Sequence, residues 1–200
     1  MKTSKRLLMA VAISPLLSFT SSIDAAQETR QTAATNMDED FNRADFPPTG
    51  WRVINHGGDC NWESTETTGN FNHTMGDGFA AEANSDWCGY GTYMNTELRS
   101  PVFSLVEDTS PALFFQYYFN GDYNSQGTVD ISTDGGHNWS TLISLESHSG
   151  PTNQITELSA YVGEPAVQIR FTYIAFFDWW FQIDDVSIIA ADEPEIEVFP

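Results

Sequence analysis

Polar and apolar residues of this chain are arranged in short stretches with the two-residue period of β-strands. Residues 166–173 show the period most clearly, because the odd positions from Val167 to Tyr173 are apolar and the even positions are polar. Residues 112–119 instead form a continuous apolar and aromatic run, which is typical of a strand covered on both faces. Both patterns predict strands that belong to a sheet with a buried face.

Turn-forming residues separate these stretches at short intervals along the chain. The other expected strands are residues 51–54, 128–132, 139–145 and 181–189. The expected turns are residues 47–50, 121–122 and 134–136. A single helical turn is expected at residues 158–162, ended by Gly163. Short strands at this spacing predict an all-β fold, an antiparallel sandwich.

Residues 1–25 have the features of a secretory signal peptide. Basic side chains occur within residues 2–6, residues 7–19 are mostly apolar, and Ala25 is a small residue at the cleavage position. A membrane anchor is the alternative interpretation, but the run is shorter than the ~20 apolar residues that a spanning helix requires. The mature chain would begin at about Ala26, and the protein is predicted to be secreted.

The rest of the chain divides into a leader, one domain and a tail. Residues 26–37 are polar and are expected to form a flexible leader, whereas residues 38–191 are enough for one domain with a core. Residues 192–194 resemble a linker, and residues 195–199 alternate like a new strand. The segment 192–200 is therefore either a solvated stub or the start of a missing module of a larger secreted protein.

The chain is strongly acidic, with 28 aspartate and glutamate residues, 8 lysine and arginine residues and a net charge of −20. Such a surface repels phosphate backbones and anionic lipids, so nucleic acid is a poor partner and no membrane insertion is expected. The excess of carboxylates has two interpretations, which are solubility and the recruitment of calcium for a few of these residues.

Cys60 and Cys88 are the two cysteines of a chain that is expected to be exported. Disulfides form in the oxidising environment outside the cell, so the simplest interpretation is one disulfide between them. Two cysteines alone cannot complete a closed zinc site.

Residues 132–139 fit the Asp-box pattern Ser-x-Asp-x-Gly-x-x-Trp, with Ser132, Asp134, Gly136 and Trp139 at the defining positions. The aspartate can accept backbone N–H groups of a tight turn, glycine allows a positive φ, and the tryptophan can pack beneath the hairpin. Sialidases carry several such boxes, where they are structural. A single box therefore predicts a structural hairpin and is no sign of a sialidase.

The most informative segment is residues 176–189, where aromatic residues precede an Asp-Asp pair and a β-branched tail. This composition suits the closing strand of a sandwich. Asp184 and Asp185 would then lie where a hard cation could bind. In the alternative interpretation they cap turns or face solvent.

A series of short motifs occurs in the order found in one family of secreted bacterial proteins. These motifs are residues 40–42, 46–51, 61–62, 98–101, 132–136, 158–163, 169–173 and 183–186. Over about residues 40–190 the chain resembles the choice-of-anchor J or cleaved-adhesin family, which is related to the MAM domains. MAM domains usually carry more cysteines than this chain. The resemblance implies a jelly-roll β-sandwich that serves as a non-catalytic adhesion or binding module.

Some members of this family bind structural calcium, and the resemblance implies candidate ligands here. The family usually has a glutamate at the place of Asn42, which can still offer a carbonyl oxygen. Asp40, Asn42 and Asp185 could meet if the first and last strands pair, and Asp184 is the fourth candidate ligand. Because calcium takes 6–8 oxygen ligands, backbone carbonyls and water would complete the shell.

Aromatic residues form the second candidate site. Trp179, Trp180 and Tyr123 are expected at loops or strand ends, where exposed rings could stack on the faces of sugars. Strand alternation would turn one of Trp179 and Trp180 inward and the other outward. The tryptophans expected in the core are Trp51, Trp62 and Trp139.

The sequence contains no nucleophile elbow, no zinc-protease motif, no phosphate-binding loop and no dinucleotide fingerprint. Its four histidines lie in polar contexts typical of loops. We therefore predict a secreted, non-catalytic module that recognises extracellular glycan or protein surfaces. A hydrolase acting on polysaccharide is one alternative, because the carboxylates are too numerous to exclude a catalytic pair. A structural spacer domain is the other.

Overall fold

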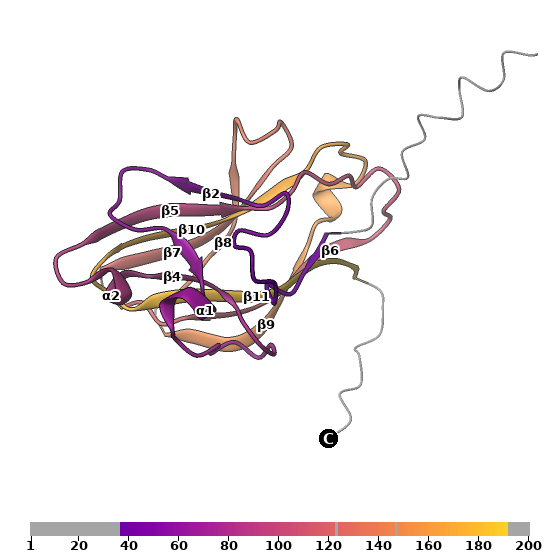
Figure 1. Cartoon of the computed structure of the whole chain (residues 1–200). Coiled ribbons are helices and arrows are strands. Elements are labelled where there is room, and N and C mark those ends of the chain that lie inside the picture. The colour runs from indigo at the N-terminus through magenta and orange to yellow at the C-terminus, as the bar shows by residue number, and fades with distance from the viewer. Residues whose placement is uncertain (1–36, 123, 147, 192–200) are drawn as a thin grey trace, which may run out of the picture. The chain divides into compact units, whose positions relative to one another are not determined.

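The computed structural model describes residues 37–122, 124–146 and 148–191, which form two antiparallel β-sheets packed as a jelly-roll sandwich (Figure 1). The predicted all-β fold class is therefore confirmed. The expected signal peptide and most of the leader, and the tail from residue 192, lie outside the described residues. Within the described part of the chain, no helix is long and apolar enough to cross a membrane.

The first sheet, called sheet I, has the strand order β3-β4-β11-β6-β9, and β1 also pairs with β11. Its strands are β1 (Asp38–Glu39), β3 (Trp62–Ser64), β4 (Ala81–Asn84), β6 (Pro111–Phe119), β9 (Ser149–Glu157) and β11 (Trp180–Ala190). The last strand is therefore central, and it pairs along its length with β4, β6 and β1.

The second sheet, called sheet II, has the strand order β2-β5-β10-β7-β8. Its strands are β2 (Arg52–Asn55), β5 (Tyr93–Arg99), β7 (Ser125–Ser132), β8 (Ser140–Ser144) and β10 (Gln168–Phe176). Three short helices complete the fold, namely α1 (Thr65–Thr68), α2 (Ser85–Cys88) and η1 (Ser159–Tyr161).

The core lies between the inner faces of the two sheets. The alternating apolar residues of β10, from Ile169 to Ala175, are fully buried against the odd-numbered aromatic residues of β6. Trp51 and Trp62 belong to this core, as predicted. Trp139 does not: its ring lies 5.0 Å from the Arg99 guanidinium and 4.5 Å from that of Arg170, outside the core cluster. The Trp139 prediction was wrong because cation–π stacking on the outer face competes with burial.

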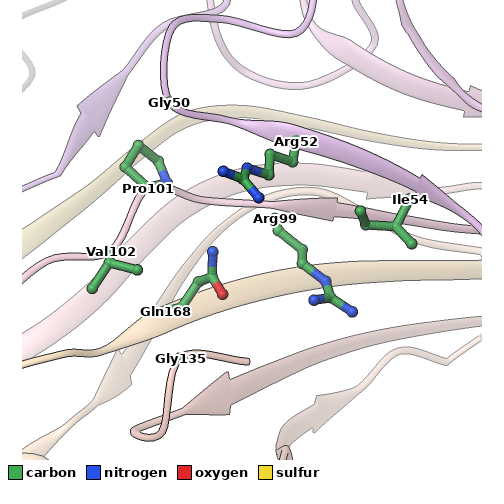
Figure 2. Close-up of a pocket in the computed structure, with 8 residues that line it drawn as sticks. All are labelled: Gly50, Arg52, Ile54, Arg99, Pro101, Val102, Gly135 and Gln168. Carbon is green, nitrogen blue, oxygen red and sulfur yellow. The ribbon is translucent and has the colours of Figure 1, made fainter. Parts of the chain in front are cut away.

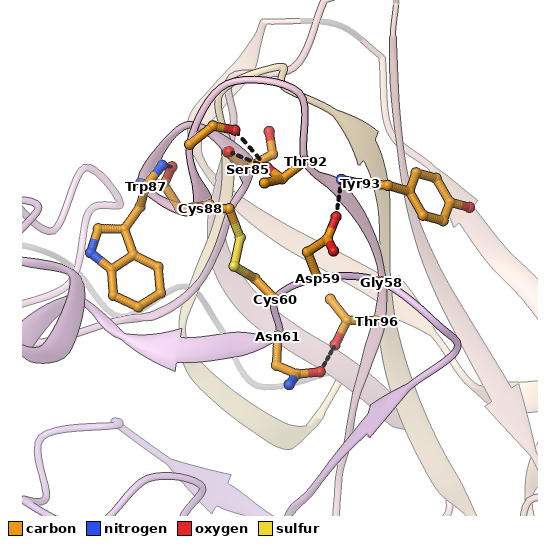
Figure 3. The surroundings of a disulfide bond; sticks show 12 residues. Gly58, Asp59, Cys60, Asn61, Ser85, Trp87, Cys88, Thr92, Tyr93 and Thr96 are labelled. Atoms are coloured by element: carbon orange, nitrogen blue, oxygen red, sulfur yellow. Dashed lines mark hydrogen bonds between the residues drawn. A yellow bond between two sulfur atoms is a disulfide. The ribbon is translucent and has the colours of Figure 1, made fainter.

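The Cys60–Cys88 disulfide is present, as predicted, and it ties the segment before β3 to the end of α2 (Figure 3). Hydrogen bonds on the Cys60 side attach the same segment to β5. Asp59 accepts from the backbone N–H of Tyr93 at 2.9 Å, and the Thr96 hydroxyl donates to Asn61 at 3.5 Å.

Candidate functional site

The central strand β11 places its side chains alternately on the two faces of sheet I. Phe181 and Ile183 are fully buried in the core. Trp180, Gln182 and Asp184 therefore point to the outer face of the sheet. The same alternation on β6 brings Tyr118 directly beside Gln182 on that face.

Five rings gather on this outer face, and we call them the aromatic surface. The His73 ring stacks on Trp180 with centroids 5.3 Å apart and an interplanar angle of 22°. Tyr118 meets His73 edge to face at 6.2 Å, and Trp179 meets Trp180 in the same way at 5.4 Å. Phe71 packs against His73 at 6.4 Å, and its side chain is 80% exposed. The aromatic surface is therefore a cluster of partly exposed rings with contacts between neighbours.

Two buried polar residues hold the loop that carries Phe71 and His73. Gln182 accepts the backbone N–H of His73 at 2.7 Å and donates to the Phe71 carbonyl at 2.9 Å. It also donates to Glu82 at 2.8 Å, and Glu82 accepts from the Asn70 amide at 2.6 Å. These bonds satisfy the polar groups of the buried Gln182 and Glu82, and such a network holds the loop in a fixed position on the sheet. The aromatic surface is thus preorganised.

Of the predicted ligand-binding residues, the structure brings Trp179 and Trp180 together. Tyr123 lies outside the described residues. The expectation that one tryptophan points into the core was wrong, since neither belongs to the core cluster. Trp179 precedes β11 and has a φ of 60°, so regular strand alternation does not apply to it.

Three members of the aromatic surface, Phe71, His73 and Tyr118, were not identified from the sequence. The alternation along β6 contains a usable signal, because Tyr118 occupies an outward position. Phe71 and His73 lie on a loop, and their position depends on hydrogen bonds from Gln182 that no local pattern reveals.

The predicted calcium ligands lie around a β-bulge of β11. The first and last strands do pair, with Asp38 opposite Ser187, and the pairing with β6 shifts between Asp184 and Ser187. Asp185 at this bulge has a φ of 47°. A bulge re-aims side chains locally, so consecutive residues escape the strict alternation of a strand.

Asp184 is fully buried beneath the loop of residues 72–76. Its Oδ2 accepts from the Asn72 amide at 2.7 Å, and its Oδ1 accepts from the backbone N–H of Asp185 at 2.9 Å. Burial raises the pKa of the Asp184 carboxyl to about 7. The Asn72 bond opposes that rise without cancelling it.

The pKa of Asp185 is also raised, first by burial and then by the negative charges of Asp40, Asp38 and Asp77. Carboxylates on β1, β11 and the adjoining loop therefore repel each other at this end of sheet I. Asn42 contacts Asp40 of this group, since its backbone N–H donates to the Asp40 carboxylate at 3.0 Å, and its Oδ1 accepts from the backbone N–H of Phe79 at 2.7 Å.

The same region has a feature that suits a cation. Gln116 Oε1 is buried without a hydrogen-bond partner among the described residues. A Cβ built on Gly76 would clash with Asp184 Oδ2 and would lie 2.8 Å from this Gln116 oxygen. Two acceptor oxygens therefore face one small space that only glycine leaves open, and their chemistry suits a hard ion. Across the described residues, no three histidine, cysteine or acidic side chains are already grouped as metal ligands.

The Asp-box residues form the turn between β7 and β8. Asp134 accepts the backbone N–H groups of His137 at 3.1 Å and Asn138 at 2.9 Å, and the Ser132 hydroxyl accepts that of Gly136 at 2.9 Å. The hydrogen bonds that Asp134 itself accepts, those of Asn138 first, lower the pKa of its carboxyl. The Trp139 indole donates to the Gly136 carbonyl at 3.1 Å.

No protein-family model matches the chain, and no curated protein is similar to it in sequence. Solved structures do share its fold. The K3 cleaved adhesin domain of Lys-gingipain from Porphyromonas gingivalis has a TM-score of 0.54 and 17% identity, covering 78% of this chain and 99% of that one. TmCBM61, solved with β-1,4-galactotriose, has a TM-score of 0.53 and 15% identity, covering 76% and 94%.

An exo-β-agarase also contains this fold, with a TM-score of 0.53 and 14% identity over 80% of this chain and 25% of the enzyme. At such identities the likeness establishes the fold alone. The resemblance to cleaved adhesins is therefore confirmed as a shared jelly-roll fold, whereas membership of the choice-of-anchor J family stays a prediction.

Proposed function

We propose that this protein is a secreted, non-catalytic binding module that recognises extracellular glycans through the aromatic surface of sheet I. The observation that carries the proposal is the stack of His73 on Trp180, flanked by Tyr118 and held from below by Gln182. Ring faces offer apolar area that can cover the C–H faces of sugars at a low entropic cost. TmCBM61 has a fold of this kind, and its structure contains β-1,4-galactotriose.

Polar groups beside the rings supply partners for sugar hydroxyls. The Tyr118 hydroxyl donates to Asn120 at 3.4 Å, and a ring nitrogen of His148 lies 3.2 Å from the same Asn120 oxygen. Hydroxyl and amide groups at the rim of an apolar surface are the usual source of orientation and specificity in ligand sites.

The hydrolase alternative would require a pair of carboxyl groups that face the substrate. Asp184 has the raised pKa of a general acid, but its side chain is fully buried and both its oxygens accept hydrogen bonds. A spacer role would leave the ring stack without a specific use. Glycan binding therefore accounts for more of the structure.

The test is binding of β-1,4-galactotriose and of a broader glycan array by the wild type and by Trp180→Ala. Loss of the stacked ring is expected to weaken binding at least tenfold, equivalent to about 1.4 kcal/mol. Isothermal titration calorimetry measures the change. Phe176→Ala is the matched control, because this phenylalanine is 54% exposed on β10 of the other sheet. Equal affinities of wild type and Trp180→Ala, with unchanged melting temperatures, would contradict the proposal.

We also propose that calcium supports the domain at the β11 bulge, with Asp40, Asn42, Asp184 and Asp185 as its ligands. Bound calcium would neutralise the repulsion between these carboxylates. At a calcium concentration of about 100 times Kd, the free energy of unfolding is expected to rise by about 2.7 kcal/mol. Asp185→Asn should remove most of this response, whereas Glu107→Gln, which removes an exposed charge elsewhere, should keep it. Superimposable thermal melts of the wild type in calcium and in EDTA would rule the site out.

A further inference from the structure

A pocket of about 360 Å³ opens on the outer face of sheet II, away from the aromatic surface. The side chains of Arg52, Arg99 and Gln168 surround its space, and Ile54, Pro101 and Val102 form apolar walls (Figure 2). The arginines come from β2 and β5, and the glutamine from β10. The volume is that of a small-ligand site, since such sites typically measure about 300–1,000 Å³.

The placement of the arginines is unusual for so acidic a chain. Arg52 pairs directly opposite Arg99 across β2 and β5, and Arg99 pairs directly opposite Arg170 across β5 and β10. Like charges directly opposite each other destabilise a sheet. The chain has only 8 lysine and arginine residues. Three of them nevertheless form one row on this face.

Acidic neighbours neutralise two of the three arginines. Arg99 Nε lies 2.6 Å from the buried Glu97, and Arg170 lies 2.7 Å from Glu97 and 2.9 Å from Asp130. His56 Nε2 also lies 2.9 Å from Glu97. Glu97 and Asp130 are thus already engaged by Arg99 and Arg170.

Arg52 is left as the uncompensated charge of the row. Its side chain is exposed, and its guanidinium makes no hydrogen bond or ion pair within the described part of the chain. Arg99 engages Glu97 through its Nε, its guanidinium lies 5.0 Å from the Trp139 ring, and the residue lines the pocket. Gln168 donates to the Ser100 carbonyl at 2.7 Å, which fixes its amide at the pocket. Positive charge and a fixed amide group therefore meet beside apolar walls.

We propose that this pocket is a second binding site, which takes the acidic group of a sugar residue, either a uronic acid carboxylate or a sulfate ester. Guanidinium groups bind such planar or tetrahedral oxyanions with paired charge-assisted hydrogen bonds. The apolar walls would cover the C–H face of the same ring. That the ligand is a sugar rests on the proposed function, whereas the preference for an anion rests on the pocket alone.

The net charge of the protein further limits the class of glycan that the pocket can bind. With its net charge of −20 the chain repels long polyanions, and the attraction of the pocket is local because charges are screened beyond about 8–10 Å at physiological salt. The ligand that fits is thus a mostly neutral glycan with isolated acidic residues, and not a uniformly charged polymer.

The experiment titrates the wild type, Arg52→Gln, Arg43→Gln and Trp180→Ala with three trisaccharides. These are trigalacturonate, a galactotriose carrying one sulfate ester, and neutral β-1,4-galactotriose. At least one acidic probe is expected to bind the wild type, with tenfold or greater weakening in Arg52→Gln and in 0.5 M NaCl. Arg43→Gln removes the same charge from an exposed site outside the pocket, so it should bind like the wild type. Which acidic probe binds more tightly distinguishes carboxylate from sulfate.

Three results would overturn the second site. They are no binding of either acidic probe by the wild type, equal affinities of wild type and Arg52→Gln, and equal losses in Arg52→Gln and Arg43→Gln. Triglutamate that binds as tightly as the acidic sugars would overturn the sugar assignment. The two proposals are tested separately. Binding of the neutral probe by Trp180→Ala tests the aromatic surface, and binding of the acidic probes by Arg52→Gln tests the pocket.

Discussion

In EDTA, the free energy of unfolding is expected to fall by several kcal/mol as the pH rises from 4 to 7, because Asp184 must ionise in a buried site. Its pKa is about 7 in the folded protein and 3.8 in the absence of the fold. Between these values the folded state keeps a proton that the unfolded state has lost, so stability declines with rising pH. The shift corresponds to an effect of the order of 4 kcal/mol at and above neutral pH.

Chemical denaturation at a series of pH values measures this effect, and Asp184→Asn identifies its source. The asparagine cannot ionise, so the variant should lack most of the decline between pH 4 and 7. Other carboxyl groups with a raised pKa, such as that of Asp185, act in the same direction. The informative quantity is therefore the difference between the pH profiles of the wild type and Asp184→Asn. Asp45→Asn, which removes an exposed carboxylate, should follow the wild type. Parallel profiles of wild type and Asp184→Asn would show that Asp184 titrates normally.

Removal of the Cys60–Cys88 disulfide is the second change with a large expected effect. The bond closes a sequence separation of 28 residues, for which the chain-entropy relation gives about 3.5 kcal/mol. For a domain of this size that loss lowers the melting temperature by roughly 10 °C. Thermal unfolding of the double variant Cys60→Ser, Cys88→Ser measures it.

A reducing agent provides the control for this prediction. It should lower the melting temperature of the wild type to near that of the double variant, and it should leave the double variant unchanged. If the wild type has the same melting temperature with and without the reducing agent, and its thiols are shown to be free in that agent, then the cross-link does not stabilise the domain.

Strands with a continuous buried face gave the clearest sequence patterns, although β2 and β8 were also predicted and contain no buried residue. β10 and β6 were found because their inward residues are apolar without exception along the core. β9 was missed because Ser149–Glu157 is a largely exposed strand with polar residues on both faces. β5 was missed because the buried Thr96 interrupts its apolar face between Met94 and Leu98. Its burial is set by the neighbouring strands and not by its own pattern.

The candidate sites were predictable to the extent that they lie on β11. Trp180 and Asp184 stand out in the sequence because an aromatic pair and an acidic pair flank one strand. His73 could not be assigned, since its place on Trp180 depends on Gln182, which lies 109 residues away. The arginine row was equally hidden, because Arg52, Arg99 and Arg170 are neighbours only through strand register.

The pairing of β1 with β11 also makes the domain suitable for circular permutation. The Met37 carbonyl accepts the backbone N–H of Ile188 at 2.9 Å, so Met37 and Ala191 are separated by about three strand residues, or roughly 10 Å. A short glycine–serine linker spans that distance. New ends opened at the exposed Glu107 would leave the sheets uninterrupted. The same closeness of ends lets the domain be inserted into a surface loop of another protein without separating the two sides of that loop.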